Sequence, residues 1–515
     1  MTSQQKDNLF VLVKSLSKSE KRQFKLYVGR LGGNTDSKFF ALFNLLDKLN
    51  KYDENAILKS GIVKKAQLSN LKAHLYKQVL ISLRLNPLHQ NIRVQVREQL
   101  DFATILYHKG LYKQSLKILE KAKKMAIDNE EKNIAYEIVE LEKVIESQYI
   151  TRSISSRADE LTEQAKYLSV QNTITSKLSN LSLQLYGIML KTGYVKNDQE
   201  FKRITKYFNE RMPKFEIEEL GFREKLWLYK SYLWYSFLIQ DFLSCYKYSN
   251  KWVEMFYDNE NMISLNPVFF LKGNHYLLES LFFIKYHSKF KEGLEKLENV
   301  INKSNLLPKE DNVDVLSFLY VFSNRLNLHF LEGTFKEGLP LVEVILKGIK
   351  RYRDRIDEHH VMVFYYKIAS LYFGAGDCKK CIEYLDKIIN NKSLHMREDL
   401  LCFSRILSLV AHYDIGQDYH LEIQLKSTYK FLIKMNDLHE VQKELIKFLR
   451  SLGDIYPQQL KNEFIKLHTS LKKFENDPYE RRAFLYLDLI SWLESKIENR
   501  PVDEIIQEKF KLIKR

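Results

Sequence analysis

The sequence predicts an all-α protein built as a solenoid of helical hairpins. The peptide Phe-Lys-Glu-Gly-Leu occurs as Phe290–Leu294 and again as Phe335–Leu339, 45 residues later, and a related turn follows at Gly376. Self-similarity at this spacing is typical of stacked helix pairs that bury their apolar faces on their neighbours. Only 17 Gly and 8 Pro occur among the 515 residues, so long windows remain in which helices can run.

The composition predicts a folded protein of the cytoplasm. The hydrophobic fraction of 45% and the charged fraction of 28% are typical of a folded chain. No apolar run approaches the roughly 18–20 residues that span a bilayer, so no membrane insertion is expected. Residues Met1–Asp7 lack the charged-then-apolar layout of a signal peptide, and the four cysteines suggest no disulfide framework.

Positive charge is concentrated near the N-terminus. The net charge is +16, and residues 1–100 hold 18 Lys and Arg against 7 Asp and Glu, a surplus of 11. A basic region on a nearly balanced body favours an anionic partner. An ordinary lysine-rich, solvated surface is the preferred explanation, because no arginine-rich cluster stands out.

Residues 1–95 predict a basic N-terminal helical domain. Ser17 and Glu20 match a capping box, in which each side chain bonds to the backbone N–H of the other residue. Gly32-Gly33 is expected to end the helix that follows, because glycine adopts the left-handed conformation that closes helices. A short helix is expected to stop at Gly61, and a longer, leucine-rich helix follows it.

Residues 96–455 predict repeated helix pairs. The clearest pair covers residues 365–390, where apolar residues recur every three or four positions on both sides of the turn Gly374–Asp377. The frame around Gly110 makes Phe102 an inward-facing residue. The same frame places further turns at Gln240, Ser288, Gly333 and Gly416.

The order of large and small residues in these pairs resembles the tetratricopeptide repeat (TPR). The resemblance covers roughly residues 95–450 and is specific at 365–390 and 99–125. Turn-to-turn spacings of 48, 45, 43 and 40 residues exceed the 34 typical of the repeat, so the units are similar to divergent repeats with longer helices. The chain also resembles uncharacterised bacterial proteins of this type. The resemblance implies a right-handed, TPR-like solenoid, and it implies no catalytic activity.

Residues 456–515 predict C-terminal capping helices. The run Phe484–Leu493 is apolar enough for one buried helix. We expect it to cover the last repeat, because the open end of a solenoid exposes apolar surface.

Two patterns that could bind metal have simpler explanations. Cys378 and Cys381 form a lone Cys-x-x-Cys, but no second ligand pair has the usual spacing, and Cys381 falls on a repeat position for a small buried residue. His359 and His360 point about 100° apart on a helix, so both rarely reach one ion. The sequence contains no phosphate loop, dinucleotide fingerprint or nucleophile elbow. We therefore expect no metal, no cofactor and no catalysis.

The N-terminal domain holds a candidate for nucleic-acid contact. Residues 54–86 can form a helix-turn-helix with Gly61 in the turn, but the second helix lacks a base-reading face of Arg, Asn and Gln. Non-specific contact with RNA, including ribosomal RNA, is favoured over sequence-specific DNA binding. The basic side chains available to phosphates are Lys64, Lys65, Lys72, Lys77 and Arg84.

The aromatic residues Trp227, Tyr232 and Trp234 are candidates for a peptide groove, because tyrosine and tryptophan are enriched in binding hot spots. About half of the aromatic stretch 227–235, in which these residues lie, must nevertheless face the core of the solenoid. TPR domains that bind the C-terminal carboxylate of chaperones use a Lys and an Asn four residues apart on the first helix. That clamp is missing at the matching pairs Leu100/Thr104, Ser323/Asn327 and Tyr366/Ser370.

We expect a non-catalytic scaffold or adaptor that binds a protein or peptide ligand on its concave face. The alternative is an adaptor that binds RNA, DNA or the ribosome through the basic N-terminal domain. A third possibility is an enzyme whose site is assembled from distant residues, which a pocket of converging acids, bases and histidines would favour.

Overall fold

The computed structural model of the chain is helical throughout its described part. It describes residues 7–30, 38–86, 89–148, 156–303, 305–353, 355–391, 398–416, 418–434, 439–452, 457–485 and 488–513. Helices account for 83% of the structure, and these residues contain no β-strand. The predicted all-α class is confirmed.

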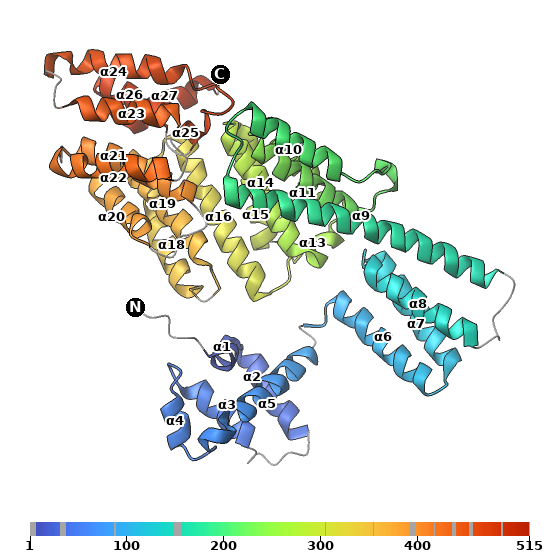
Figure 1. Cartoon of the computed structure of the whole chain (residues 1–515). Helices are drawn as coiled ribbons and strands as arrows, with labels where there is room; N and C mark the ends of the chain where they lie inside the picture. Colours follow the sequence, from blue (N-terminus) through green and yellow to red (C-terminus); the bar gives the residue numbers. More distant parts are fainter. Residues whose placement is uncertain are drawn as a thin grey trace. The chain divides into compact units, whose positions relative to one another are not determined.

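The chain divides into two compact units, residues 1–168 (unit 1) and 169–515 (unit 2). Helix α9 (Arg157–Thr192) begins in unit 1 and ends in unit 2 (Figure 1). The sequence-based boundaries near residues 95 and 455 lie inside these units and stay predictions.

Unit 1 contains two separate hydrophobic cores, one formed by α1–α5 and one by α6–α8 with the start of α9. The predicted capping box is confirmed: the Ser17 N–H donates to Glu20 Oε2 (2.7 Å), and the Glu20 N–H donates to Ser17 Oγ (3.2 Å). The predicted helix end at Gly32-Gly33 lies outside the described residues. The helices of unit 1 before α9 are α1 (Asn8–Ser15), α2 (Lys18–Arg30), α3 (Lys38–Lys48), α4 (Glu54–Lys59), α5 (Lys65–Arg84), α6 (Ile92–His108), α7 (Tyr112–Asp128) and α8 (Lys132–Gln148).

Unit 2 is built around one large core. Its first helices after α9 are α10 (Asp198–Arg211), the 3-10 helix η3 (Ile217–Glu219), α11 (Phe222–Leu238), α12 (Phe242–Asp258), α13 (Asn261–Leu265), α14 (Pro267–Phe283), α15 (His287–Lys303) and α16 (Asp311–Glu332). The following helices are α17 (Phe335–Gly338), α18 (Pro340–Arg351), α19 (Glu358–Gly374), α20 (Cys378–Ile389), α21 (Glu398–Asp414), α22 (Asp418–Lys434), α23 (Glu440–Ser451), α24 (Pro457–Lys472), α25 (Arg482–Leu485), α26 (Leu489–Glu498) and α27 (Val502–Ile513).

Helices in both units pack mainly on their neighbours in sequence, as in α6 with α7, α11 with α12, and α19 with α20 (Figure 1). Small residues lie where paired helices meet. Ala369 and Cys381 are fully buried between α19 and α20, and Ser115 donates a hydrogen bond to the Ala103 carbonyl (2.8 Å) between α6 and α7. This packing is consistent with a helical repeat or solenoid.

One hydrogen-bonded turn recurs along the chain. A residue with φ between 53° and 85° ends a helix, and the next N–H donates to the carbonyl five residues earlier, over 2.8–3.1 Å. This is the Schellman arrangement, which satisfies the last carbonyls of a helix. The left-handed residues of these turns are Gly110, Glu130, Gln240, Lys285, Gly333, Gly376 and Asn499.

The predicted turn at Ser288 is wrong by three residues. The left-handed residue is Lys285, with φ 54°, and Ser288 lies inside α15. The frame failed because a lysine occupies a position that glycine usually takes.

The inward position predicted for Phe102 is also wrong, because its side chain is 45% exposed. Helix α6 packs on α7 and α8, which follow it, and Phe102 lies on the face turned away from them.

The C-terminal run Phe484–Leu493 is not one helix. Helix α25 ends at Leu485, and Asp488 begins α26, since its carboxylate accepts the Ser491 N–H over 2.9 Å. An N-cap residue must have non-helical backbone angles, which interrupts the predicted helix there.

The last helix, α27, contacts α16 in the middle of unit 2. Lys336 pairs with Asp503 (2.9 Å), and Gln507 Nε2 donates to the Gly333 carbonyl (3.0 Å). The Phe510 ring lies 4.6 Å from the ring of His287. The C-terminal segment therefore returns to a repeat that precedes it by more than 150 residues.

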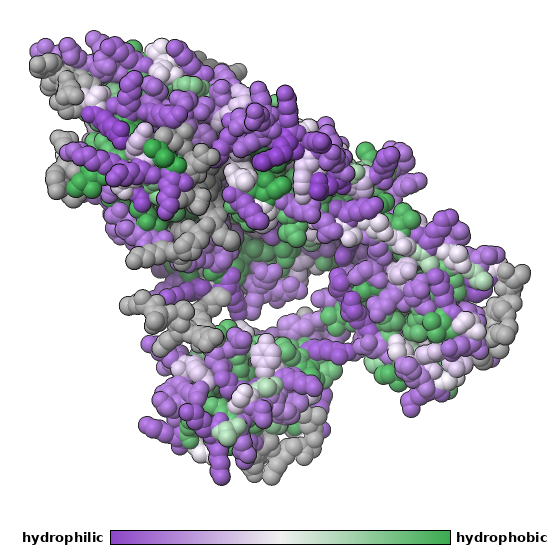
Figure 2. All heavy atoms as spheres, viewed as in Figure 1, coloured by the Kyte–Doolittle hydropathy of each residue, from purple (hydrophilic) through white to green (hydrophobic). Residues whose placement is uncertain are grey.

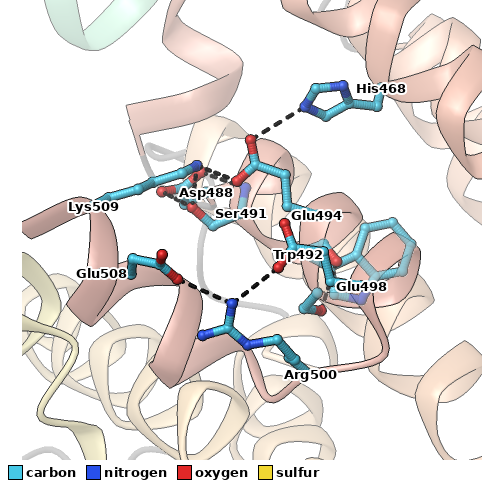
Figure 3. Close-up of polar contacts among 10 residues, drawn as sticks. His468, Asp488, Ser491, Trp492, Glu494, Glu498, Arg500, Glu508 and Lys509 are labelled. Atoms are coloured by element: carbon cyan, nitrogen blue, oxygen red, sulfur yellow. Dashed lines mark hydrogen bonds and ion pairs between the residues drawn. The ribbon is translucent and has the colours of Figure 1, made fainter.

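Ion pairs hold α26 and α27 together (Figure 3). Lys509 contacts Glu494 (2.5 Å) and Ser491 (2.8 Å), while Arg500 bridges Glu498 and Glu508 at 3.0 Å each.

The face of the molecule seen in Figure 2 is largely hydrophilic, with small, scattered hydrophobic areas. In the described residues, no helix combines the length and the apolar character that crossing a membrane requires.

Candidate functional site

Unit 2 contains a cavity of about 1070 Å³. Its walls come from α9, α11, α14, α16 and α19, together with residues of the C-terminal segment such as Val502, Ile506 and Phe510 of α27. We call this space the unit-2 cavity. Helices separated by more than 300 residues in sequence form its surface.

Aromatic side chains form one wall of the unit-2 cavity. The Trp234 ring lies 4.8 Å from Tyr186 and 5.5 Å from Tyr276, and His275 stacks on Tyr320 with ring centroids 4.4 Å apart. These contacts join α9, α11, α14 and α16. Rigid aromatic surfaces of this kind supply much contact area at low entropic cost when a ligand binds.

A chain of polar side chains crosses α19, α16 and α14. Lys367 Nζ donates to Asn327 Oδ1 (2.5 Å), Asn327 Nδ2 donates to Asn324 Oδ1 (3.4 Å), and Asn324 Nδ2 lies 3.3 Å from His275 Nδ1. Beyond it, His275 Nε2 lies 3.7 Å from Glu279. We call these five residues the polar chain.

The direction of the polar chain follows from the side-chain amides. Asn324 Nδ2 also donates to the Tyr320 carbonyl (2.8 Å), which fixes the orientation of this amide. Because an amide nitrogen only donates, His275 Nδ1 must accept, and the proton of the neutral ring is on Nε2, toward Glu279. Every donor therefore points from the Lys367 ammonium toward the Glu279 carboxylate.

Burial controls the charges of the polar chain. It lowers the pKa of His275 to about 4; Glu279 opposes this shift, while Lys367, His360 and Lys272 add to it. Burial also lowers the pKa of Lys367 to about 8, again opposed by Glu279. Both side chains keep some contact with water because they open into the cavity, although protein surrounds them. At pH 7 His275 is neutral and Lys367 is charged.

Of the three predicted groove aromatics, the structure brings one to the unit-2 cavity. Trp234 is 8% exposed and lines it. Tyr232 stacks on Tyr248, with ring centroids 4.4 Å apart, and Trp227 packs edge-on against Phe269.

The predicted nucleic-acid residues lie on α5 or, for Lys64, at its N-cap, and they differ in their contacts with other residues. Lys72 pairs with Asp7 and donates to Tyr52 Oη (3.0 Å), and its pKa is raised because these hydrogen bonds outweigh the effect of burial. Arg84 lies 3.5 Å from Asp101. The remaining three side chains, all exposed, are Lys64, Lys65 and Lys77.

Cys378 and Cys381 are buried, and burial raises the pKa of both thiols, to about 12 for Cys378. A high pKa disfavours the thiolate that metal binding or redox chemistry requires. Within the described ranges, no group of three or more His, Cys, Asp or Glu residues could hold a metal ion.

The polar chain has no local signature in the sequence. The repeat frame pairs Asn327 with Ser323 on its own helix, whereas its hydrogen-bond partner Lys367 lies 40 residues further along the chain, on α19. The available signal is the recurrence of polar residues at 275, 324, 327 and 367, on helices whose other residues are mostly apolar or aromatic.

No family model, curated protein or solved structure matches the sequence. The fold and the cavity define a class: an all-helical protein whose helices pack mainly on their sequence neighbours, as in a helical repeat or solenoid.

Proposed function

We propose that the chain is a right-handed, TPR-like repeat protein, and that it serves as a non-catalytic scaffold that binds a peptide segment of a partner protein in the unit-2 cavity. The volume of about 1070 Å³ carries this proposal. Sites for small molecules typically measure about 300–1,000 Å³, so this space, at the upper end of that range, can hold a peptide of several residues and is too small for a folded domain.

The chemistry of the walls supports a peptide ligand. The Trp234 and Tyr276 rings provide apolar contacts for side chains, and the polar chain lies beside them on neighbouring helices. Amide, hydroxyl and ammonium groups in an apolar cavity can hold the carbonyl and N–H groups of a peptide backbone.

Binding is favoured over catalysis because Lys367 and the Nδ1 atom of His275 contact amides, and Glu279 lies 3.7 Å from His275 Nε2, beyond hydrogen-bond distance. Nucleophilic catalysis requires a nucleophile beside a base. Ser370, a cavity residue with a hydroxyl group, donates instead to the Tyr366 carbonyl (3.0 Å). The converging groups that would favour an enzyme are present, but their hydrogen bonds do not form a reactive pair.

Photo-crosslinking from inside the cavity tests the proposal. Tyr186 is 39% exposed and lines the cavity, so the additional ring of a benzophenone amino acid at this position can extend into open space. Crosslinks in cells to one contiguous segment of a partner protein are expected. The matched control is Leu243, which is 69% exposed on α12. Equal crosslinking from both positions, or none from Tyr186, would contradict the proposal.

An adaptor that binds RNA or the ribosome remains the second proposal, since Lys64, Lys65 and Lys77 are exposed. It requires affinity that falls steeply with salt and that is lost when these lysines are neutralised. A filter-binding titration with a ribosomal RNA fragment at two salt concentrations tests it, and salt-independent binding would contradict it.

A further inference from the structure

Three half-buried lysines lie on the inner helices of unit 2: Lys230 on α11, Lys272 on α14 and Lys367 on α19. Within the part of the chain that the structure describes, none of them forms an ion pair with a carboxylate. Exposed lysines of the same unit do, for example Lys347 with Glu343 at 2.6 Å. We call these three residues the lysine strip.

Lys367 lines the unit-2 cavity, and the other two lysines of the strip lie next to cavity residues on their helices. Lys230 lies one helical turn before Trp234, and Lys272 lies one turn before His275 and Tyr276, so they share the faces of these lining residues. Lys230 Nζ lies over the Trp227 ring at 4.5 Å from its centroid.

The pKa values of two lysines in the strip are lowered. Burial, together with the charge of Lys272, lowers the pKa of Lys230 to about 8, and burial lowers the pKa of Lys272 as well. Buried cations are normally paired, since the loss of hydration is otherwise uncompensated. Lys367 is hydrogen-bonded to Asn327 and Lys230 lies over aromatic rings, but none of the three has a carboxylate partner in the described part of the chain, which favours an anionic ligand on this surface.

The acids around the cavity leave this excess of positive charge in place. Asp488 accepts hydrogen bonds from Ser491, and Glu200 accepts from the Lys196 N–H over 2.9 Å. Glu279 faces the neutral His275. Three carboxylates therefore lie around the cavity, and among the described residues none of them forms an ion pair with a lysine of the strip.

We propose that the lysine strip binds the carboxylates of an acidic peptide segment, an inference that rests on the peptide-binding function proposed above. Lys230 and Lys272 on adjacent inner helices would share one acidic side chain, and Lys367 would bind a second. Helix α19 is two packing steps from α14 through α16. Neighbouring helices lie about 8–10 Å apart, and an extended peptide advances about 3.3 Å per residue, so the two acids should be about five residues apart.

A peptide fits this surface better than a nucleic acid. Base stacking needs free aromatic faces. Trp234 is almost fully buried, and the Tyr320 face is covered by His275. An acidic peptide can still place apolar side chains against the edges of these rings.

Selection from a random twelve-residue peptide display library on the full-length protein tests the proposal. We expect enrichment of peptides with two Asp or Glu residues about five positions apart. A synthetic peptide of that consensus should bind about tenfold more weakly to Lys272→Met and to Lys367→Met, since each removes one partner of a desolvated charge pair. The Lys379→Met control, at an exposed position on α20, should bind as the unmodified protein does.

The possible results separate this inference from the proposed function. Enriched peptides without acidic residues, or equal affinity in all variants, would overturn the inference that the lysine strip binds carboxylates. The proposed peptide-binding function would then still stand. No enrichment at all would overturn both. If a twelve-nucleotide oligouridine binds the strip and competes with the consensus peptide at equal charge, nucleic acid replaces the peptide as the ligand. Circular dichroism of each variant confirms that it is folded.

Discussion

Lys367 is expected to reduce the stability of the unliganded protein. Its pKa of about 8 in place of 10.5 means that folding disfavours the charged form. At 1.36 kcal/mol per pKa unit this amounts to about 3 kcal/mol. The Lys367→Met variant avoids this cost but loses the hydrogen bond to Asn327, which stabilises the unmodified protein by about 1.5–3 kcal/mol. A net gain of about 1 kcal/mol is expected at pH 7.

The pH dependence provides the sharper test. The folded-state pKa lies below the unfolded value, so the cost is present in full below pH 8 and disappears as the pH rises toward 10.5. Between these values the unfolded state binds more protons, and the stability of the unmodified protein must rise relative to Lys367→Met. The advantage of the variant should therefore shrink between pH 7 and 9.5.

Urea unfolding followed by tryptophan fluorescence measures this difference. All four tryptophans, Trp227, Trp234, Trp252 and Trp492, belong to unit 2, so the signal reports this unit. Lys379→Met is the control for loss of an exposed lysine on α20. A Lys367→Met variant that is less stable at pH 7, by an amount that does not change with pH, would refute the reasoning about burial.

Three further predictions concern turns and thiols. Gly333→Ala should destabilise unit 2 more than Gly376→Ala. Both glycines have positive φ, so an alanine costs about 1 kcal/mol at either position. Only at Gly333 would the added Cβ also meet α27, at 3.0 Å from the Asp503 carbonyl oxygen. Equal urea midpoints for the two variants would contradict the docking of α27 at this turn. Lys285→Gly should stabilise the protein by about 0.5–1 kcal/mol by relieving its left-handed backbone, and an unchanged midpoint would contradict that strain. Finally, Ellman's reagent at pH 8 should label no cysteine rapidly in the native protein, because all four are buried, and fast labelling of even one thiol would show otherwise.

The fold could be predicted wherever local chemistry determines local structure. Gly333 and Gly376 mark turns because glycine is the residue that adopts positive φ without strain. Gln240 and Lys285 adopt the same conformation without that advantage, in turns closed by the same local hydrogen bond. The turn near Lys285 was consequently placed three residues late, at Ser288. At Asp488 a local signal is present but lies inside an apolar run. Its carboxylate caps α26 and so divides the single helix that the run predicts.

The candidate site could not be predicted in the same way, because its geometry depends on the register between repeats. The Asn324–His275 and Lys367–Asn327 contacts join residues 49 and 40 positions apart, on helices whose alignment depends on the length of each turn and pair. A shift of one residue would turn each side chain by about 100° and break the chain of donors. The unequal spacings between repeats therefore affect the site, because they set the alignment of the helices. In this alignment the ammonium, the two amides, the imidazole and the carboxylate of the polar chain lie next to one another.

Helix α27 is part of the surface that a ligand meets when it approaches the polar chain. Helix α27 forms part of the cavity wall and is fixed at Gly333 by Gln507 and at Lys336 by Asp503. In the ion pair the Lys336 side chain is 64% exposed, whereas that of Asp503 is only 9% exposed. Apolar packing and a second ion pair add to these contacts, since Ile505 is buried and Lys509 pairs with Glu494 of α26 over 2.5 Å. A peptide in the unit-2 cavity is therefore expected to contact α27 directly, since Val502, Ile506 and Phe510 line the cavity.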